Sequence, residues 1–122
     1  MWQVAFFDDF DHEFAKLEEQ VQDALLASIL LLHRFGPALG RPHADVLFGS
    51  AFSNMKELRV TTAGGAWRLA FAFDPQRKAI LLVAGNKAGS AQRRFYRNLV
   101  AIADRRYRRH LDRLATLGLE EH

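Results

Sequence analysis

The chain has 122 residues, of which 49% are hydrophobic and 25% are charged, and this composition argues against an intrinsically disordered protein. The length suits one domain spanning residues 1–122, and the lack of cysteine excludes a disulfide framework and a thiolate metal site. The N-terminus is acidic where a signal peptide would be basic, and the apolar run at 25–35 is too short to cross a bilayer. We therefore expect a soluble, cytoplasmic protein that does not associate with membranes.

Charge is distributed unevenly along the chain. Residues 1–55 hold three Lys or Arg against eight Asp or Glu, a net charge of −5. Residues 56–122 hold fourteen against six, a net charge of +8, so the whole chain carries +3. A basic region of this strength indicates a face that binds an anionic partner, usually nucleic acid, although a basic helix can also be ordinary solvated surface.

The first part of the chain predicts a short strand and then a long helix. Residues 3–7 are typical of a strand, and the three aspartates that follow favour the start of a helix. From Phe14 to Phe35, apolar residues recur every three or four positions on one helical face, and the Gly-Pro pair after them would end the helix. Residues 40–50 are expected to be a connector with one helical turn that has Pro42 at its first position.

The rest of the chain predicts three strands and a final helix. The strands are expected at 55–60, 66–73 and 79–85, joined by the turn-type sequences TAGG and DPQR. Helical spacing returns from residue 91 to about residue 117. The expected order is β-α-α-β-β-β-α, which is an α+β fold with a small, mostly antiparallel sheet flanked by helices.

The predicted hairpin at residues 57–73, ELRVTTAGGAWRLAFAF, keeps charged side chains among apolar ones. The bulky residues of its second strand share one face: Trp67, Leu69, Phe71 and Phe73. Arg68 lies on the other face with two alanines, and Glu57 and Arg59 of the preceding strand point to the same side. This pattern predicts either an open polar site floored by alanines or a surface ion pair between the strands.

Several short motifs, in this order and at this spacing, carry a resemblance to a known family. They are NMKELRV, GGAWRLAFAFD, AILLVAGNKAG and RRFYRNLVAIADRRYRRHL. With these motifs, the sequence from Leu39 to about Leu114 resembles the RelE/HigB superfamily of bacterial toxins. The resemblance is specifically to the phage-derived HigB-like branch of type II toxin–antitoxin systems.

The resemblance implies a fold, an activity and a set of partners. The implied fold is a small twisted antiparallel sheet flanked by helices, which agrees with the predicted elements. The implied activity is cleavage of messenger RNA without a metal or other cofactor, usually on translating ribosomes. The implied partner is a cognate antitoxin, commonly a helix-turn-helix protein, which blocks the toxin in a hetero-oligomeric complex.

The resemblance also implies roles for individual residues. Arg68 matches the position that holds the scissile phosphate, and Arg59 matches an arginine that adds positive charge. Lys87 falls where the family places a basic residue that stabilises the charge of the transition state. Tyr96 or its neighbour Phe95 falls where many members have a tyrosine, whose ring could stack on a base and whose phenol could aid proton transfer.

Glu57 departs from the family pattern, because the best-studied members carry a basic residue at that position. Attack by the RNA 2′-hydroxyl requires a base, so we expect Glu57 either to accept that proton or to hold Arg59 and Arg68 in place. Lys56 is expected to compensate in phosphate contact. Further RNA contacts are expected from the arginines that open the last helix: Arg93, Arg94 and Arg97.

More distant basic residues of the last helix are expected to bind ribosomal RNA or acidic groups of the antitoxin. They are Arg105, Arg106, Arg108 and Arg109. The histidines are scattered without the spacing of metal ligands, so no metal is expected. They are His12, His33, His43, His110 and His122.

Three alternatives to a ribonuclease stay open from the sequence. ParE-like toxins share the fold and poison DNA gyrase, but tend to lack the basic and aromatic set that this chain keeps. The chain could also be a module that binds nucleic acid without cleaving it, or a toxin that has lost its activity.

Overall fold

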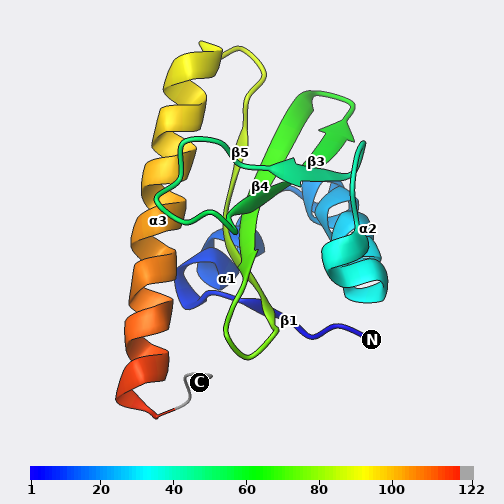
Figure 1. Cartoon of the computed structure of the whole chain (residues 1–122). Coiled ribbons are helices and arrows are strands. Elements are labelled where there is room, and N and C mark those ends of the chain that lie inside the picture. Colours follow the sequence, from blue (N-terminus) through cyan, green and yellow to red (C-terminus); the bar gives the residue numbers. More distant parts are fainter. Residues whose placement is uncertain (119–122) are drawn as a thin grey trace.

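The computed structural model describes residues 1–118, so residues 119–122, with His122 and the C-terminal LEEH, lie outside the described part. Figure 1 shows a small sheet with helices on either side of it. In chain order the elements are β1 (Val4–Phe6), α1 (Asp8–Ala15), α2 (Glu19–Phe35), η1 (Gly36–Ala38), β2 (Ala44–Val46), β3 (Lys56–Thr62), β4 (Gly65–Phe73), β5 (Ala79–Asn86) and α3 (Gln92–Thr116). No helix within residues 1–118 is both long enough and apolar enough to span a lipid bilayer.

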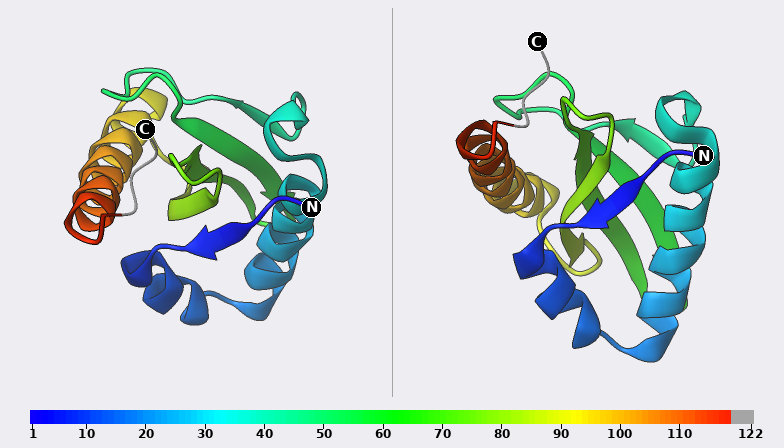
Figure 2. Two further views of the ribbon diagram at one scale, coloured as in Figure 1. Left: turned by 60° about the horizontal axis from the view of Figure 1, so that its bottom comes forward. Right: turned by 90° about the horizontal axis from the view of Figure 1, so that it is seen from below.

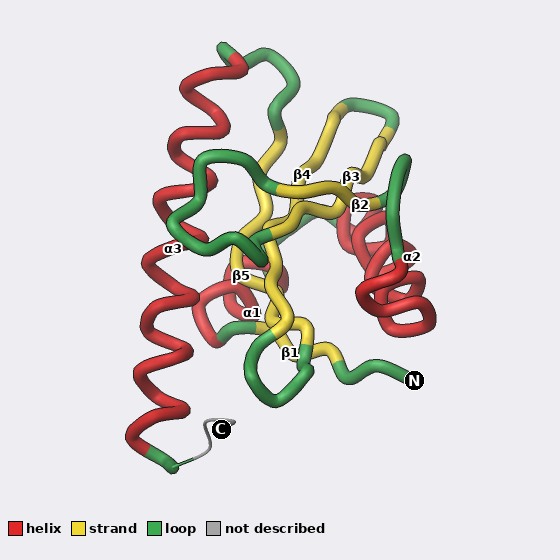
Figure 3. Tube along the Cα trace, in the orientation of Figure 1, coloured by secondary structure: helices red, strands yellow, loops and turns green. Residues whose placement is uncertain are grey.

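The five strands of the described residues form one sheet in the order β1-β5-β4-β3-β2 (Figure 3). Strands β2 to β5 pair antiparallel with their neighbours, while β1 at one edge runs parallel to β5. The predicted α+β fold with a mostly antiparallel sheet is confirmed. The predicted order lacked one strand, β2.

Helices α1 and α2 cover one face of the sheet. Phe10 of α1 and Leu25 and Leu32 of α2 are at most 1% exposed, and they pack with Leu58 and Leu69 of the sheet. The bulky face of β4 lies in this layer, as the alternation predicted. Each such buried side chain contributes about 1.5–3 kcal/mol relative to an exposed one.

Helix α3 covers the opposite face, so the sheet lies between two helical layers (Figure 2). Leu99 and Ala103 of α3 pack in one cluster with Ala70 and Ala72 of β4, which are 0% exposed. The expectation that these two alanines floor an open site is therefore wrong. Their small side chains instead let the helix lie close against the strands.

The long helix predicted before residue 36 is two helices. The amides of Lys16 and Leu17 bond to carbonyls three residues back, which tightens the chain at the end of α1. Glu18 is extended, and α2 starts at the next residue. The apolar spacing did not reveal this break because Phe14 and Val21, on either side of it, pack against the same core.

At Pro42, where one helical turn was predicted, the structure has a single hydrogen-bonded turn, in which the amides of His43 and Ala44 bond to the Gly40 carbonyl, but no helix. The 3₁₀ turn η1 lies earlier, at Gly36–Ala38, and Pro42 stands just before the strand β2, whose Ala44 pairs with Leu58 of β3. Three residues are too few to show a period of two, so alternation could not reveal β2.

Candidate active site

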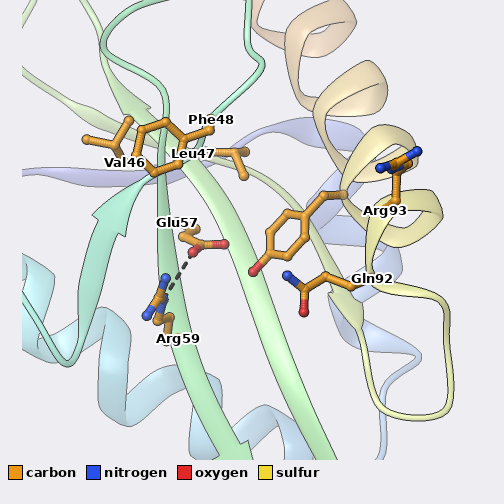
Figure 4. A pocket seen from close by; sticks show the side chains of 8 residues that line it. Val46, Leu47, Phe48, Glu57, Arg59, Gln92 and Arg93 are labelled. Atoms are coloured by element: carbon orange, nitrogen blue, oxygen red, sulfur yellow. Dashed lines mark hydrogen bonds and ion pairs between the residues drawn. The ribbon is translucent and has the colours of Figure 1, made fainter.

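A hollow of about 590 Å³ opens between the first turns of α3 and the start of β3. Figure 4 shows one wall formed by the end of β2 and the residues after it, another formed by α3, and two charged side chains of β3 between them. The residues that line the hollow are Val46, Leu47, Phe48, Glu57, Arg59, Gln92, Arg93 and Tyr96.

Glu57 lies at the floor of this hollow and is only 2% exposed. It pairs across the sheet with Ala70, whose small side chain leaves room for the carboxylate. Its Oε2 accepts a hydrogen bond from Arg59 Nε at 3.0 Å, and its Oε1 lies 3.9 Å from Arg68 Nε. Within the described residues, Oε1 has no hydrogen-bond partner. This oxygen is itself fully buried, which is costly for an acceptor without a donor. The Tyr96 hydroxyl interacts with the same carboxylate, and burial together with this contact raises the pKa of Tyr96.

Arg59 and Arg68 are direct cross-strand neighbours of β3 and β4. Like charges opposite each other destabilise a sheet, and the carboxylate of Glu57 offsets that repulsion. The hydrogen bond that Arg59 donates to Glu57 raises the pKa of Arg59, and Asp45 of β2, 3.5 Å from Arg59 Nη2, acts in the same direction. The Arg59 side chain is 41% exposed and that of Arg68 only 12%, so Arg59 is the more accessible cation.

The hydroxyl of Tyr96, in the second turn of α3, accepts a hydrogen bond from Arg68 Nε at 3.1 Å. Burial raises the pKa of Tyr96; the hydrogen bond from Arg68 opposes this, while the charge of Glu57 adds to it. The phenol therefore keeps its proton at neutral pH and can act as a donor. Lys87, which follows β5, has its Nζ 5.9 Å from the centre of the Tyr96 ring.

Sequence analysis proposed five residues for the chemistry, and the structure brings all five together. We call them the sheet cluster: Glu57, Arg59, Arg68, Lys87 and Tyr96. Hydrogen bonds and ion pairs link four of them, and Lys87 joins the cluster through a cation–π contact with the Tyr96 ring. The arrangement places three cations beside one carboxylate and one phenol, which is a set suited to an anionic ligand. Their individual chemical roles stay predictions.

Lys56 does not belong to this hollow. Met55 packs in the core layer under α3 and Glu57 lines the hollow on the same face. Because side chains alternate along a strand, Lys56 between them points to the other face of the sheet. The predicted phosphate contact by Lys56 does not fit this position.

The residues predicted for RNA contact on α3 lie in different places. Arg93 lines the hollow, whereas Arg94 and Phe95 line a smaller, largely apolar depression between α3 and β5. The Phe95 ring packs against Gly85 of β5, so closely that a Cβ atom on Gly85 would lie 3.0 Å from it. Phe95 also lies edge-on to the Tyr96 ring and therefore helps to hold the tyrosine in place. Arg97 is exposed and lines neither depression.

Sequence analysis missed one whole wall of the hollow. It consists of Val46, Leu47 and Phe48, and Gln92 was also missed on the facing helix. Phe48 is 75% exposed, which is unusual for a large aromatic side chain. The sequence did hold a signal for this wall in the stretch Leu-Phe-Gly-Ser at residues 47–50, because a connector that is only a solvated loop has no need of two adjacent large apolar side chains.

The middle of α3 is anchored to the acidic N-terminal helix. Arg106 is 9% exposed; it donates to both Glu13 oxygens, at 2.8 and 2.6 Å, and to the Leu82 carbonyl at 2.8 Å. These hydrogen bonds to Glu13 raise the pKa of Arg106. Arg109 donates to Asp9 at 3.1 Å. The prediction that Arg106 docks on RNA or an antitoxin is therefore wrong, because its charge is used within the fold.

Two histidines contribute to the fold away from the hollow. His110 Nε2 lies 2.8 Å from Asp74 Oδ2, and the other Asp74 oxygen accepts amides of the β4–β5 turn. His33 contacts the carbonyl of Trp2. In the described part of the chain, no three His, Cys, Asp or Glu side chains gather so that they could hold a metal ion.

Comparison with known proteins gives one family for this fold and site. The family described as "Phage derived protein Gp49-like (DUF891)" matches residues 12–108. A solved structure of the E. coli toxin RelE, a mutant in the free state, has a TM-score of 0.61 over 86% of this chain and 96% of that one. At 14% identity this likeness concerns the fold alone.

Two curated relatives come from Mycobacterium tuberculosis. "Putative toxin HigB3" is 47% identical over 103 residues, which cover 84% of this chain and 88% of that protein. "Putative toxin HigB2" is 43% identical over 96 residues, which cover 78% of this chain and 47% of that protein. The fold and these matches define a RelE/HigB-type toxin domain. The chain belongs to the phage-derived Gp49-like family, the HigB-like branch of the toxins of toxin–antitoxin systems.

Proposed function

We propose that this protein arrests growth by cleaving messenger RNA at the hollow over β3. The observation that carries the proposal is the sheet cluster. A buried carboxylate, two arginines and a protonated phenol lie within hydrogen-bonding or ion-pair distance of one another, and Glu57, Arg59 and Tyr96 of this set line the hollow. The two M. tuberculosis relatives are named as toxins, which supports the same role here.

The proposed reaction needs only the RNA and protein side chains. The 2′-oxygen forms a bond to the adjacent phosphorus while the bond from phosphorus to the 5′-oxygen breaks, leaving a cyclic 2′,3′-phosphate and a free 5′-hydroxyl. The Glu57 carboxylate accepts the 2′-hydroxyl proton, and the Tyr96 phenol donates a proton to the departing oxygen. Arg59, Arg68 and Lys87 stabilise the negative charge that builds up on the phosphate oxygens.

The proposal extends to partners. Exposed arginines at the start of α3 give the rim of the hollow a positive charge, which suits an RNA backbone. We propose that the substrate is messenger RNA on translating ribosomes. We also propose that a cognate antitoxin, a helix-turn-helix protein as is common in this branch, binds the toxin in a hetero-oligomer.

Two other functions suit the same fold. A gyrase poison would not need the sheet cluster, and a module that only binds nucleic acid would not need a carboxylate beside a protonated phenol. Both features are present here, and they favour cleavage.

Substitution of Arg68 tests the proposed function. Expression of the wild type without its antitoxin is expected to stop growth, and Arg68→Ala to relieve the arrest, because the scissile phosphate loses its most enclosed cation. Arg34→Ala, an exposed arginine on α2 at the other face of the sheet, is the matched control and is expected to stay toxic. Circular dichroism of both variants confirms that they fold. An Arg68→Ala protein that is folded and fully toxic would show that the site lies elsewhere.

A further inference from the structure

Phe48 stands at the rim of the hollow with most of its ring in solvent. At 75% exposure it is the most exposed aromatic side chain of residues 1–118, whereas Phe10 and Phe71 are at most 1% exposed. Its neighbour Val46 is 40% exposed on the same wall. An exposed aromatic ring does not contribute the free energy of burial to the fold. Exposed apolar side chains that gather at the edge of a site therefore indicate a surface that binds a ligand.

The segment that carries Phe48 is held firmly against the rest of the molecule. Leu47, beside it, is 2% exposed, and its amide bonds to the Met55 carbonyl at 3.0 Å. Further along, the Ala51 amide donates to Asp104 of α3 at 2.8 Å. The ring is thus presented from a braced loop, which lowers the entropy lost on binding.

The surroundings of Phe48 are polar and cationic. Figure 4 shows Phe48 on the wall that follows β2, Gln92 and Arg93 on the facing helix, and Arg59 below. An unpaired nucleobase has a flat face that stacks on an aromatic ring and an edge that hydrogen-bonds to amides and guanidinium groups. An aliphatic side chain of a protein partner would leave those polar groups without partners.

We propose that Phe48 is a stacking platform for one unpaired base of the RNA, next to the phosphate held by the sheet cluster, with Gln92 placed to hydrogen-bond the base edge. This inference rests on the proposed function. It assigns the wall at Val46 to Phe48 to substrate binding, and it makes Phe48 a residue that governs affinity and base preference without taking part in proton transfer.

The test compares Phe48→Ala, Phe48→Tyr and a control, Leu30→Ala, which removes an exposed apolar side chain (65% exposed) from α2. The substrate is a short messenger RNA, presented free and on ribosomes, with every base intact or with single bases removed near the cleavage site. Phe48→Ala is expected to raise KM about ten- to hundredfold, the range that one stacked base supplies, with a much smaller change in kcat. Phe48→Tyr and Leu30→Ala are expected to behave like the wild type.

Removal of the base that stacks on Phe48 should raise the KM of the wild type. The same removal should leave the KM of Phe48→Ala unchanged, because this variant has no ring on which the base could stack. A KM for Phe48→Ala that equals the wild-type value would overturn the inference while cleavage itself still stands. The inference would also be overturned if Phe48→Ala weakened only the binding of the antitoxin, because the wall would then belong to the interface with the protein partner. If the wild type cleaves neither free nor ribosome-bound RNA, the proposed function fails first and the inference falls with it.

Discussion

At the scale of single residues, Glu57 shares its two oxygens between two arginines: Oε2 bonds to Arg59, and Oε1 lies 3.9 Å from Arg68. A buried charge is tolerated when it is paired, and this pairing also holds the two guanidinium groups next to each other, with Arg59 at the hollow. Oε1 is buried and has no hydrogen-bond donor among the described residues, so it can receive a proton from the substrate only after a neighbouring side chain moves. We propose that this one side chain both positions the cations and receives the proton.

The isosteric substitution Glu57→Gln separates these two tasks. If Glu57 accepts the 2′-hydroxyl proton, kcat for RNA cleavage is expected to fall about 10²- to 10⁴-fold with little change in KM. Steady-state kinetics on a short RNA measures both constants. A higher KM with unchanged kcat would mean that Glu57 only positions the arginines. Asp23→Asn, at an exposed carboxylate of α2, is the matched control and is expected to change neither constant.

Tyr96→Phe removes the proposed proton donor and keeps the ring. Because burial holds the pKa of Tyr96 above the ordinary tyrosine value of about 10, the phenol loses its proton only as the pH rises through that raised pKa. We expect wild-type kcat to show no loss from this group between about pH 7 and pH 9, and to decline only above about pH 10. Tyr96→Phe should be slower at all these pH values and lack the alkaline decline. A wild-type decline below about pH 9 that Tyr96→Phe abolishes would contradict the raised pKa.

At the scale of elements, α3 has two tasks along its length. Its first turns bring Gln92, Arg93 and Tyr96 to the hollow. Farther along, Arg106 reaches across to Glu13 of α1 and to the Leu82 carbonyl of β5. The position of the catalytic end therefore depends on an anchor that takes no part in the chemistry.

Removal of this anchor is expected to weaken the fold more than the chemistry. Arg106→Ala leaves a buried carbonyl and a half-exposed carboxylate without their donor, so the free energy of unfolding should fall by about 1–2 kcal/mol. Urea unfolding followed by circular dichroism measures this change. The neighbouring exposed Arg105→Ala is the control and should stay within about 0.5 kcal/mol of the wild type. Equal stability of the two variants would show that the anchor contributes nothing.

At the scale of the whole molecule, opposite charges from the two halves of the sequence pair with each other where α1 and α3 lie side by side. Acidic residues of α1 pair with arginines of α3, through Glu13 with Arg106, Asp9 with Arg109 and Asp8 with Arg113. The basic surface left for RNA is therefore smaller than the charge count suggested. Exposed arginines outside these ion pairs remain at the start of α3, near the hollow, and farther along it at Arg105 and Arg108.

Much of the sheet could be predicted from the sequence, because β3 and β4 alternate, β5 is a short continuous apolar run, and turn residues join the three strands. Two features could not be predicted. The break between α1 and α2 was hidden because the apolar spacing continues across it, and the strand β2 was missed because it has only three residues. The grouping of Arg59 with Arg68 followed from strand alternation alone. Phe48 was missed because its wall depends on β2, and Lys56 was misplaced because strand alternation was not applied to it.

The most direct measurement of the central claim is the mapping of 5′ ends of cellular transcripts by primer extension. Cells express the wild type or Arg68→Ala without antitoxin. If the sheet cluster cleaves messenger RNA, new 5′ ends within messenger RNAs are expected for the wild type and none for Arg68→Ala. Growth arrest by the wild type with intact transcripts and damaged DNA, as a gyrase poison would give, would contradict this claim.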